Sequence, residues 1–178
     1  MSEEGYSTGK AYNATTILKD GAGQETGFSG EKEFGNWLLF HRFAYTSCGS
    51  ETMHHDYIIH LGKRDVTVDV KTKRRNVPYN HELFEGHVNC TQRHFGCDIY
   101  VFASEHDEGV VFGGWITKKA FWNRCEMVKQ GERTSKGFAE KRDSGKIKHT
   151  SLKDMIALEK MLRKLGGNDE GEESTEGS

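Results

Sequence analysis

The sequence has no long apolar run. No apolar stretch in its 178 residues approaches the length of about 18 residues that a membrane-spanning helix needs. The first residues, Met1–Glu4, contain neither the basic region nor the hydrophobic stretch of a secretion signal. We therefore expect a cytoplasmic protein that does not associate with membranes.

Cysteine is scarce and is not arranged for metal binding. The chain contains no Cys-x-x-Cys pair, so nothing in its cysteine spacing indicates zinc or redox chemistry. The four cysteines are Cys48, Cys90, Cys97 and Cys125. We expect reduced, partly buried thiols.

The chain also lacks a strong net charge, but its charges are unevenly distributed. The formal net charge is −2, and the last segment, residues 166–178, holds five acids and no base, so residues 1–165 carry a net charge of +3. Clustered bases contact nucleic-acid phosphates in many proteins. The residues that we expect to do so are Lys73, Arg74, Arg75, Lys118 and Lys119. The alternative is that each cluster is an ordinary solvated face.

Length and composition indicate one domain. A chain of this length with 34% hydrophobic and 11% aromatic residues can bury a single core. Residues 1–24 mix Gly, Ser, Thr and charged side chains, which predicts a flexible arm. We expect the folded domain over residues 25–165 and a disordered acidic tail over residues 166–178.

Two runs in the middle of the chain alternate as half-buried strands do. In residues 56–61 and 65–71, apolar side chains fall on one side and polar side chains on the other. The apolar side consists of Tyr57, Ile59, Leu61, Val66, Val68 and Val70. The polar side carries two acids and a lysine, Asp56, Asp69 and Lys71.

The register of this predicted hairpin depends on its turn. A two-residue turn at Gly62–Lys63 would place Asp56 opposite Asp69. A turn at Lys63–Arg64 would place Asp56 opposite Lys71 instead. A slip by one residue would set an apolar face against a polar one, so both permitted registers keep the three groups together.

Two carboxylates on one sheet face repel each other by about 4 kcal/mol at an effective dielectric near 20, so we expect a cation between them. A hard divalent ion, Mg²⁺ or Mn²⁺, suits Asp56 and Asp69 together with the backbone carbonyl of Val70. Lys71 would position a metal-bound water and stabilise charge on a phosphate. The pattern predicts phosphodiester hydrolysis; the alternative is a solvated hairpin face with an ordinary surface ion pair.

An upstream segment predicts a helix that carries an acid. Ser29 is a suitable N-cap. The apolar stripe that follows at helical spacing is Phe34, Trp37, Leu38 and His41. With this stripe on the sheet, Glu31 shares its edge and Glu33 projects to one side, so we favour Glu31 as the helix acid and keep Glu33 as its substitute.

The residues Asp56 and Asp69-Val70-Lys71 resemble the PD-(D/E)xK nuclease superfamily, which includes restriction endonucleases and Holliday-junction resolvases. The resemblance implies an α/β fold with a restriction endonuclease-like core, in which helices flank a central mixed sheet of four or five strands. It implies that Glu31 supports a second metal ion or orients the first, and that Gln92 assists at the water or the phosphate. His55 stands where many members have proline. For Gln92, a plain surface amide is the alternative.

Further elements follow from apolar runs and capping residues. We expect a third strand over residues 97–103, a fourth over 109–116, a helix capped by Thr117, and a last helix that starts at Ser151 and ends at Gly166. Two polar segments are predicted as loops, residues 72–87 over the site and residues 130–148.

Together these features predict a metal-dependent nuclease that acts on DNA and, as relatives often do, could form a homodimer. Three alternatives stay open. The chain could bind nucleic acid without cutting it, or it could cut RNA. It could also be a histidine-metal finger nuclease built on His54, His55 and His60, with His81 and His87, but that class needs a helix after the hairpin, where we expect a strand.

Overall fold

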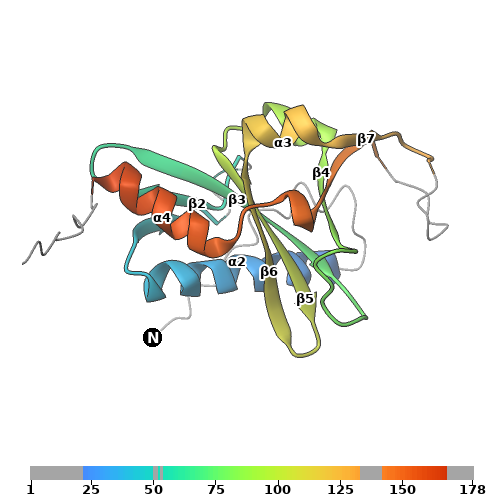
Figure 1. The fold of residues 1–178 in the computed structure, drawn as a ribbon, viewed down its shortest axis with the longest axis horizontal. Helices are drawn as coiled ribbons and strands as arrows, with labels where there is room; N and C mark the ends of the chain where they lie inside the picture. Colours follow the sequence, from blue (N-terminus) through green and yellow to red (C-terminus); the bar gives the residue numbers. More distant parts are fainter. Residues whose placement is uncertain (1–21, 50–51, 53, 133–141, 168–178) are drawn as a thin grey trace, which may run out of the picture.

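The strands of the protein form two sheets (Figure 1). The computed structural model describes residues 22–49, 52, 54–132 and 142–167. Within these residues the larger sheet has five strands in the order β1-β2-β3-β5-β6, and the smaller sheet has three in the order β4-β8-β7.

The elements have the following bounds. The larger sheet consists of β1 (Ala44–Ser47), β2 (Tyr57–His60), β3 (Asp65–Arg74), β5 (Ile99–His106) and β6 (Gly109–Thr117). The smaller sheet consists of β4 (Glu85–Asn89), β7 (Glu126–Val128) and β8 (Ser144–Lys148). The helices are α2 (Ala22–Phe40), α3 (Lys118–Arg124) and α4 (Met155–Gly166), with short 3-10 turns η1 (Cys90–His94) and η2 (His149–Ser151).

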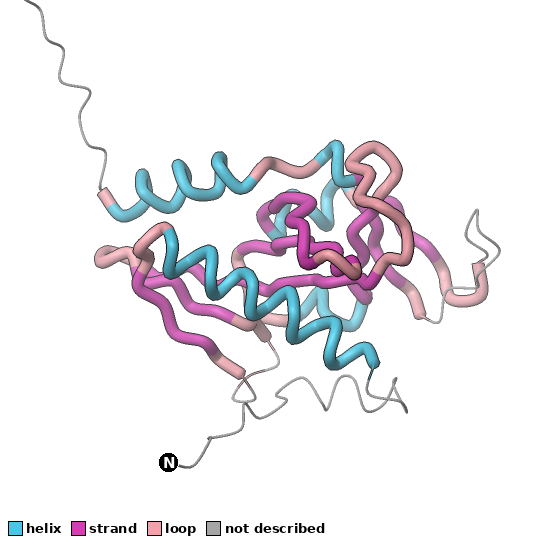
Figure 2. Tube along the Cα trace, turned by 90° about the horizontal axis from the view of Figure 1, so that it is seen from below, coloured by secondary structure: helices cyan, strands magenta, loops and turns pink. Residues whose placement is uncertain are grey.

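The larger sheet is mixed, because β3 and β5 run parallel while its other neighbours run antiparallel. Helices lie on both of its sides, and Figure 2 shows α2 lying along one face. The predicted architecture, an α/β fold with a central mixed sheet of four or five strands flanked by helices, is confirmed with five strands. None of the helices among the described residues is long and apolar enough to cross a membrane.

One core lies between the larger sheet and the helices α2 and α4. The alternating valines of β3 point into it and meet apolar side chains from both helices. Its fully buried members include Phe34 and Leu38 of α2, Val66 and Val68 of β3, and Leu158 and Leu162 of α4. This packing fixes which face of β3 is apolar, and therefore which face carries its polar side chains.

A second core covers the other face of the larger sheet. Side chains of β5 and β6 on this face meet α3 and the smaller sheet. Its buried members are Val88, Tyr100, Phe102, Ile116, Phe121 and Ile147. The polar face of β3 therefore looks toward the layer that contains the smaller sheet.

The hairpin of β2 and β3 has the first of the two predicted registers. Tyr57 pairs with Val68, and His60 pairs with Asp65. The turn is closed by a hydrogen bond of 3.1 Å from Leu61 N to Arg64 O, and its first central residue is Gly62 with φ of 79°. A two-residue turn with a positive φ suits glycine, and the predicted turn at Gly62–Lys63 is confirmed.

Several predicted boundaries are wrong. Helix α2 already includes Ala22, so Ser29 lies inside the helix and is not its N-cap. At the next position, Gly30, any side chain would collide with Thr72 of β3, so α2 can pack this closely against the strand only with glycine there. Helix α4 starts after Asp154, whose Oδ1 accepts a hydrogen bond of 2.7 Å from Ala157 N, and Ser151 belongs to η2.

The two predicted loops are shorter than expected. Strand β3 continues to Arg74 because β5 pairs with it along that length, and β4 begins at Glu85, so both ends of the segment 72–87 are strands. Strand β8 lies within the segment 130–148 because it pairs with β4 and β7, which are distant in sequence. Residues 133–141 of that segment lie outside the described residues, as do most of the predicted arm and tail.

The other elements agree with expectation. The third and fourth predicted strands are β5 and β6, and Thr117 caps α3 through a hydrogen bond of 3.2 Å from Ala120 N to its hydroxyl oxygen. None of the four cysteines, all of which lie in the described part of the chain, forms a disulfide; Cys48 is buried and the other three are partly buried. The expectation of reduced, partly buried thiols therefore holds for their placement.

Two adjacent leucines of α2 test the packing of this helix. Leu38 is 0% exposed and Leu39 is 62% exposed. We expect Leu38→Ala to lower the free energy of unfolding by about 2–5 kcal/mol because it leaves a cavity in the core. The control Leu39→Ala should change it by less than about 0.5 kcal/mol. Urea unfolding of both variants measures the difference; equal effects would contradict the placement of α2.

Candidate active site

Asp69 and Lys71 form a buried ion pair on the polar face of β3. Lys71 Nζ lies 2.6 Å from Asp69 Oδ2, and the two side chains are only 15% and 2% exposed. The carboxylate of Asp69 also acts on the nearby thiol of Cys97. Burial of this thiol and the negative charge of Asp69 together raise the pKa of Cys97 to about 12. The pair is therefore held away from water, unlike the solvated hairpin face that was the alternative.

Asp56 lies beside this pair, immediately before β2. Its backbone is fixed on both sides by hydrogen bonds of 2.8 Å, from Cys48 N to Asp56 O and from Asp56 N to Val68 O. Its side chain is buried, and Oδ2 accepts a hydrogen bond of 2.7 Å from Val70 N. The carboxylate thus binds the edge of β3 at the point where β2 no longer covers it. The alternation pattern did not predict this bond.

This bond also gives the direction of the Val70 carbonyl. In an extended strand the N–H and C=O groups of one residue point to the same edge, and successive residues alternate. Val68 O faces β2 and Thr67 O faces β5, as their hydrogen bonds show. Val70 therefore presents its carbonyl oxygen to the edge where Asp56 lies.

The helix acid Glu31 is near the same edge, and Glu33 is not. Tyr57 donates a hydrogen bond of 2.7 Å from its hydroxyl to Glu31 O. Burial raises the pKa of Tyr57, and the negative charges of Glu31 and Asp56 raise it further, so both acids lie within electrostatic reach of this phenol. Glu33 is exposed and accepts a hydrogen bond of 3.2 Å from Asn36 Nδ2. Glu33 therefore projects to one side, and the choice of Glu31 as the helix acid stays a prediction.

Gln92 lies on the short turn η1 between β4 and β5. Asn89 caps this turn by accepting a hydrogen bond of 3.0 Å from Thr91 N, and Gln92 O accepts one of 3.1 Å from Phe95 N. The Gln92 side chain is half-buried. The turn holds it shortly before β5, and its role at the water or the phosphate stays a prediction.

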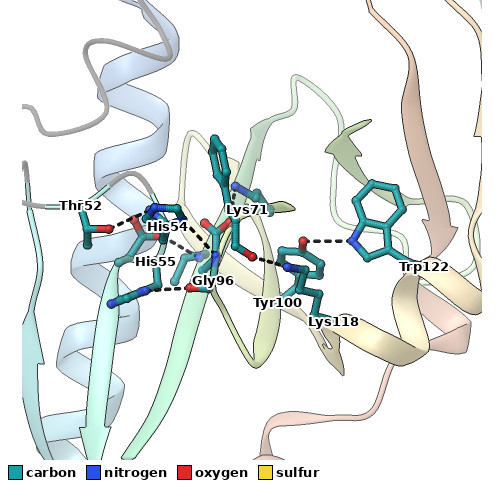
Figure 3. Close-up of polar contacts among 12 residues, drawn as sticks. Thr52, His54, His55, Lys71, Gly96, Tyr100, Lys118 and Trp122 are labelled. Carbon is teal, nitrogen blue, oxygen red and sulfur yellow. Dashed lines mark hydrogen bonds and ion pairs between the residues drawn. The ribbon is translucent and has the colours of Figure 1, made fainter. Parts of the chain in front are cut away.

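Two histidines, whose contacts the sequence did not predict, fasten this region to Asp56. Gly96 N donates a hydrogen bond of 3.0 Å to His54 Nδ1, and His55 Nδ1 donates one of 2.8 Å to Gly96 O. Figure 3 shows both rings reaching the backbone of Gly96. We call these two bonds the histidine clasp. Its only sequence signal is the His-His pair directly before Asp56.

The loop held by the clasp also receives contacts from its other side. The ring of Phe95 meets His54 edge to face at 5.3 Å, and Phe95 O accepts a hydrogen bond from Lys118 Nζ. Beyond Lys118 in Figure 3, Trp122 Nε1 donates a hydrogen bond of 3.2 Å to the hydroxyl of Tyr100. The clasp therefore connects Asp56, through the loop at Gly96, to the layer that contains α3.

The five bases predicted to contact nucleic acid differ in their surroundings. Arg74 forms ion pairs with Glu105 and Asp107 at 3.2 and 2.9 Å. The Arg75 guanidinium lies over the Phe84 ring, 4.0 Å from its centroid. Lys118 donates its hydrogen bond to Phe95 O, as described above. Lys118 and the exposed Lys119 both line a hollow of about 580 Å³.

The fifth base, Lys73, lines a different cavity together with Lys71. This cavity of about 250 Å³ lies between β3 and β4, and we call it the β3–β4 cavity. His87 and His149 also line it. Burial lowers the pKa of each imidazole to about 4, assisted at His87 first by the positive charge of Lys73 and at His149 first by that of Arg75. Both rings are therefore neutral at pH 7.

The donor set at the β3 edge fits a hard divalent cation. Asp56 and Asp69 supply carboxylate oxygens, and Val70 supplies a carbonyl oxygen, which are the ligand types of Mg²⁺ and Mn²⁺. In the described part of the chain, no three His, Cys, Asp or Glu side chains gather closely enough to hold one ion. Mg²⁺ needs fewer protein ligands than that, since it usually keeps several waters and takes one or two carboxylates.

The histidine-metal finger alternative disagrees with the structure. His60 is followed by β3 rather than by a helix. Its two ring nitrogens bond to Thr46 Oγ1 at 2.8 Å and to Asp65 Oδ1 at 3.0 Å. His81 and His87 stand apart from it, before and within β4.

Comparison with known proteins finds a likeness among solved structures. No protein-family model matches the sequence, and no curated protein matches it. The structure is similar to Hjc, a Holliday junction resolvase from the archaeal hyperthermophile Archaeoglobus fulgidus, with a TM-score of 0.45 and 12% identity over 75% of this chain and 95% of that one.

The histidine clasp predicts protection of a single amide. Gly96 is exposed, so its N–H is shielded mainly by the bond to His54. We expect His54→Ala to speed hydrogen exchange at Gly96 N about fivefold, the effect of losing a hydrogen bond worth about 1 kcal/mol. His54→Asn should preserve protection, because the amide oxygen can take the place of Nδ1. Exchange rates from NMR test this; identical rates in both variants would disprove the bond.

The buried imidazole of His149 predicts a pH dependence of stability. Its pKa is about 4 in the folded chain and about 6.5 when unfolded, so the unfolded state binds more protons between these values. The stability it contributes is complete above pH 6.5 and is lost as the pH falls toward 4, by up to about 3 kcal/mol. We expect His149→Gln to show a shallower fall in the free energy of unfolding over this range. An unchanged slope would contradict the shift.

Proposed function

We propose that the protein is a metal-dependent nuclease that hydrolyses phosphodiester bonds of DNA, with a restriction endonuclease-like core of the PD-(D/E)xK type. The observation that carries the proposal is the burial of Asp69 beside Lys71 on the polar face of β3, with the buried Asp56 at the edge of the same strand. Removing such charges from water costs several kcal/mol per ion, and a face with a purely structural role avoids this cost. A site that handles a metal ion and a phosphate needs these groups.

The ligands that we assign to Mg²⁺ or Mn²⁺ are Asp56, Asp69 and the carbonyl oxygen of Val70. The hydrogen bond from Val70 N to Asp56 Oδ2 holds this carboxylate at the edge of β3. Glu31 lies on the same edge and supports a second ion or orients the first. A bound ion would polarise the phosphate and lower the pKa of an attacking water.

Lys71 and Gln92 are the proposed groups for water and phosphate. The Lys71 ammonium is held at 2.6 Å by Asp69, which fixes its position on the polar face of β3. From there it donates hydrogen bonds to the attacking water and stabilises negative charge that develops on the phosphate. Gln92, at the start of the segment that leads into β5, assists with its amide.

The five bases supply the proposed contacts with nucleic acid. Lys73 and Lys119 have exposed side chains that can approach phosphates directly. Arg74, Arg75 and Lys118 hold partners within the protein, and they contribute to the positive field around the site.

The test is cleavage of labelled linear, circular, single-stranded and branched DNA, with Mg²⁺, with Mn²⁺ and with chelator. We expect metal-dependent cleavage by the wild-type chain. Asp69→Asn and Lys71→Met should each slow it by about 100-fold or more, because one removes a metal ligand and the other the group that positions water.

The matched control is Asp65→Asn, which removes an exposed carboxylate from the same strand. It should retain wild-type cleavage. Asp69→Asn leaves Lys71 buried without its partner, so unfolding curves must show that each variant is folded. Full activity in both site variants would refute the assignment. Cleavage of RNA alone would change the substrate, and binding of nucleic acid without cleavage would indicate a binding protein.

A further inference from the structure

The β3–β4 cavity begins where the proposed active site ends. One of its walls is formed by Lys71 and Lys73 on β3, and the opposite wall includes Glu85 and His87 on β4. Phe102 and the fully buried His149 also line it. Its volume of about 250 Å³ is several times the roughly 30 Å³ that one water occupies in the liquid, so it has room for a phosphate group.

The cavity has an excess of positive charge. Lys71 and Lys73 line it, and the positive charges of Lys73, Lys146 and Arg75 all act on the imidazole of His87. The Lys146 ammonium is 24% exposed and the His87 ring 22% exposed, so water screens these groups only in part.

Three acids lie near these four bases. Glu85 is the acid that lines the cavity, and it lies 3.8 Å from His87 and 3.9 Å from Lys146. Lys146 is closer to Glu126, at 3.2 Å, but that acid is 72% exposed. Asp69 is engaged by Lys71. A half-buried site with more cations than acids attracts an anion.

We propose that the β3–β4 cavity binds one phosphate group of a nucleic acid, held by Lys73 and His87, next to the phosphate that Lys71 faces. Same-face residues two apart on a strand are about 6.6 Å apart, which matches the separation of neighbouring phosphates along an extended nucleic-acid strand. Lys73 donates charge-assisted hydrogen bonds to the phosphate oxygens. His87 adds a neutral imidazole N–H. The position of the second phosphate rests on the proposed function; the binding of a phosphate does not.

The experiment measures binding of a short DNA oligonucleotide to the full chain in chelator, so that no cleavage occurs. Affinity is measured at several salt concentrations for the wild type, for Lys73→Gln and for the control Lys160→Gln, which removes an exposed lysine from α4. We expect the slope of log affinity against log salt to shrink by about one for Lys73→Gln and to stay unchanged for the control. An unchanged slope for Lys73→Gln would overturn the proposal, as would an absence of binding by the wild type.

A second measurement locates the phosphate. Neutral methylphosphonate linkages are placed one at a time along the oligonucleotide, and the end carries either a 5′-phosphate or a 5′-hydroxyl. We expect one position at which neutralisation weakens the wild type but leaves Lys73→Gln and His87→Asn unaffected, because these variants have already lost that contact. An internal position assigns the cavity to a phosphodiester, and the 5′ end assigns it to a terminal phosphate. If every position weakens all proteins equally, the cavity does not bind a phosphate.

These outcomes are independent of catalysis. A chain that shows the position-specific effect but never cleaves keeps the phosphate site and loses the proposed nuclease. A chain that cleaves with Mg²⁺ but lacks the effect keeps the nuclease and loses the phosphate site.

Discussion

The ion pair of Asp69 and Lys71 is the constraint on which the rest of the site depends. Two charged side chains that are almost withdrawn from water are tolerable only if their geometry is held closely. Strand β3 holds this geometry because its valines are buried in the core with side chains of α2 and α4. The residues that alternate with these valines, Asp69 and Lys71 among them, must therefore lie on the opposite face. β5 pairs along one edge of β3, and Asp56 takes up the other edge where β2 stops.

Much of this arrangement follows from local patterns. The alternation of apolar and polar residues around Asp56, Asp69 and Lys71 predicted the hairpin. It left two registers open, two residues apart, because a slip of one residue would mismatch the faces. Gly62, with its positive φ in the turn, selects the first of the two. The α/β architecture with a mixed sheet of four or five strands was also predicted. The exposed position of Glu33 on α2 followed from helical spacing alone.

The remaining features depend on contacts between distant segments. Strand β8 carries Gly145 and two lysines, Lys146 and Lys148, which read as loop until β4 and β7 pair with it. The bond from Val70 N to Asp56 reflects the early end of β2, which no periodicity encodes. The histidine clasp joins residues 41 and 42 positions apart, so His54 and His55 had no partner that could be inferred from spacing.

The register of β4 with β8 has a consequence for how the chain acquires its structure. The hairpin of β2 and β3 closes over a two-residue turn, whereas β4 meets β8 through pairs such as Glu85 with Lys148. Local contacts form quickly, and distant ones wait for a large loop to close. During synthesis the hairpin, with Asp69, Lys71 and Lys73, is complete while β8 has yet to leave the ribosome. The β3–β4 cavity is therefore closed last, so an unfinished chain presents these charged side chains before the cavity can enclose a polyanion.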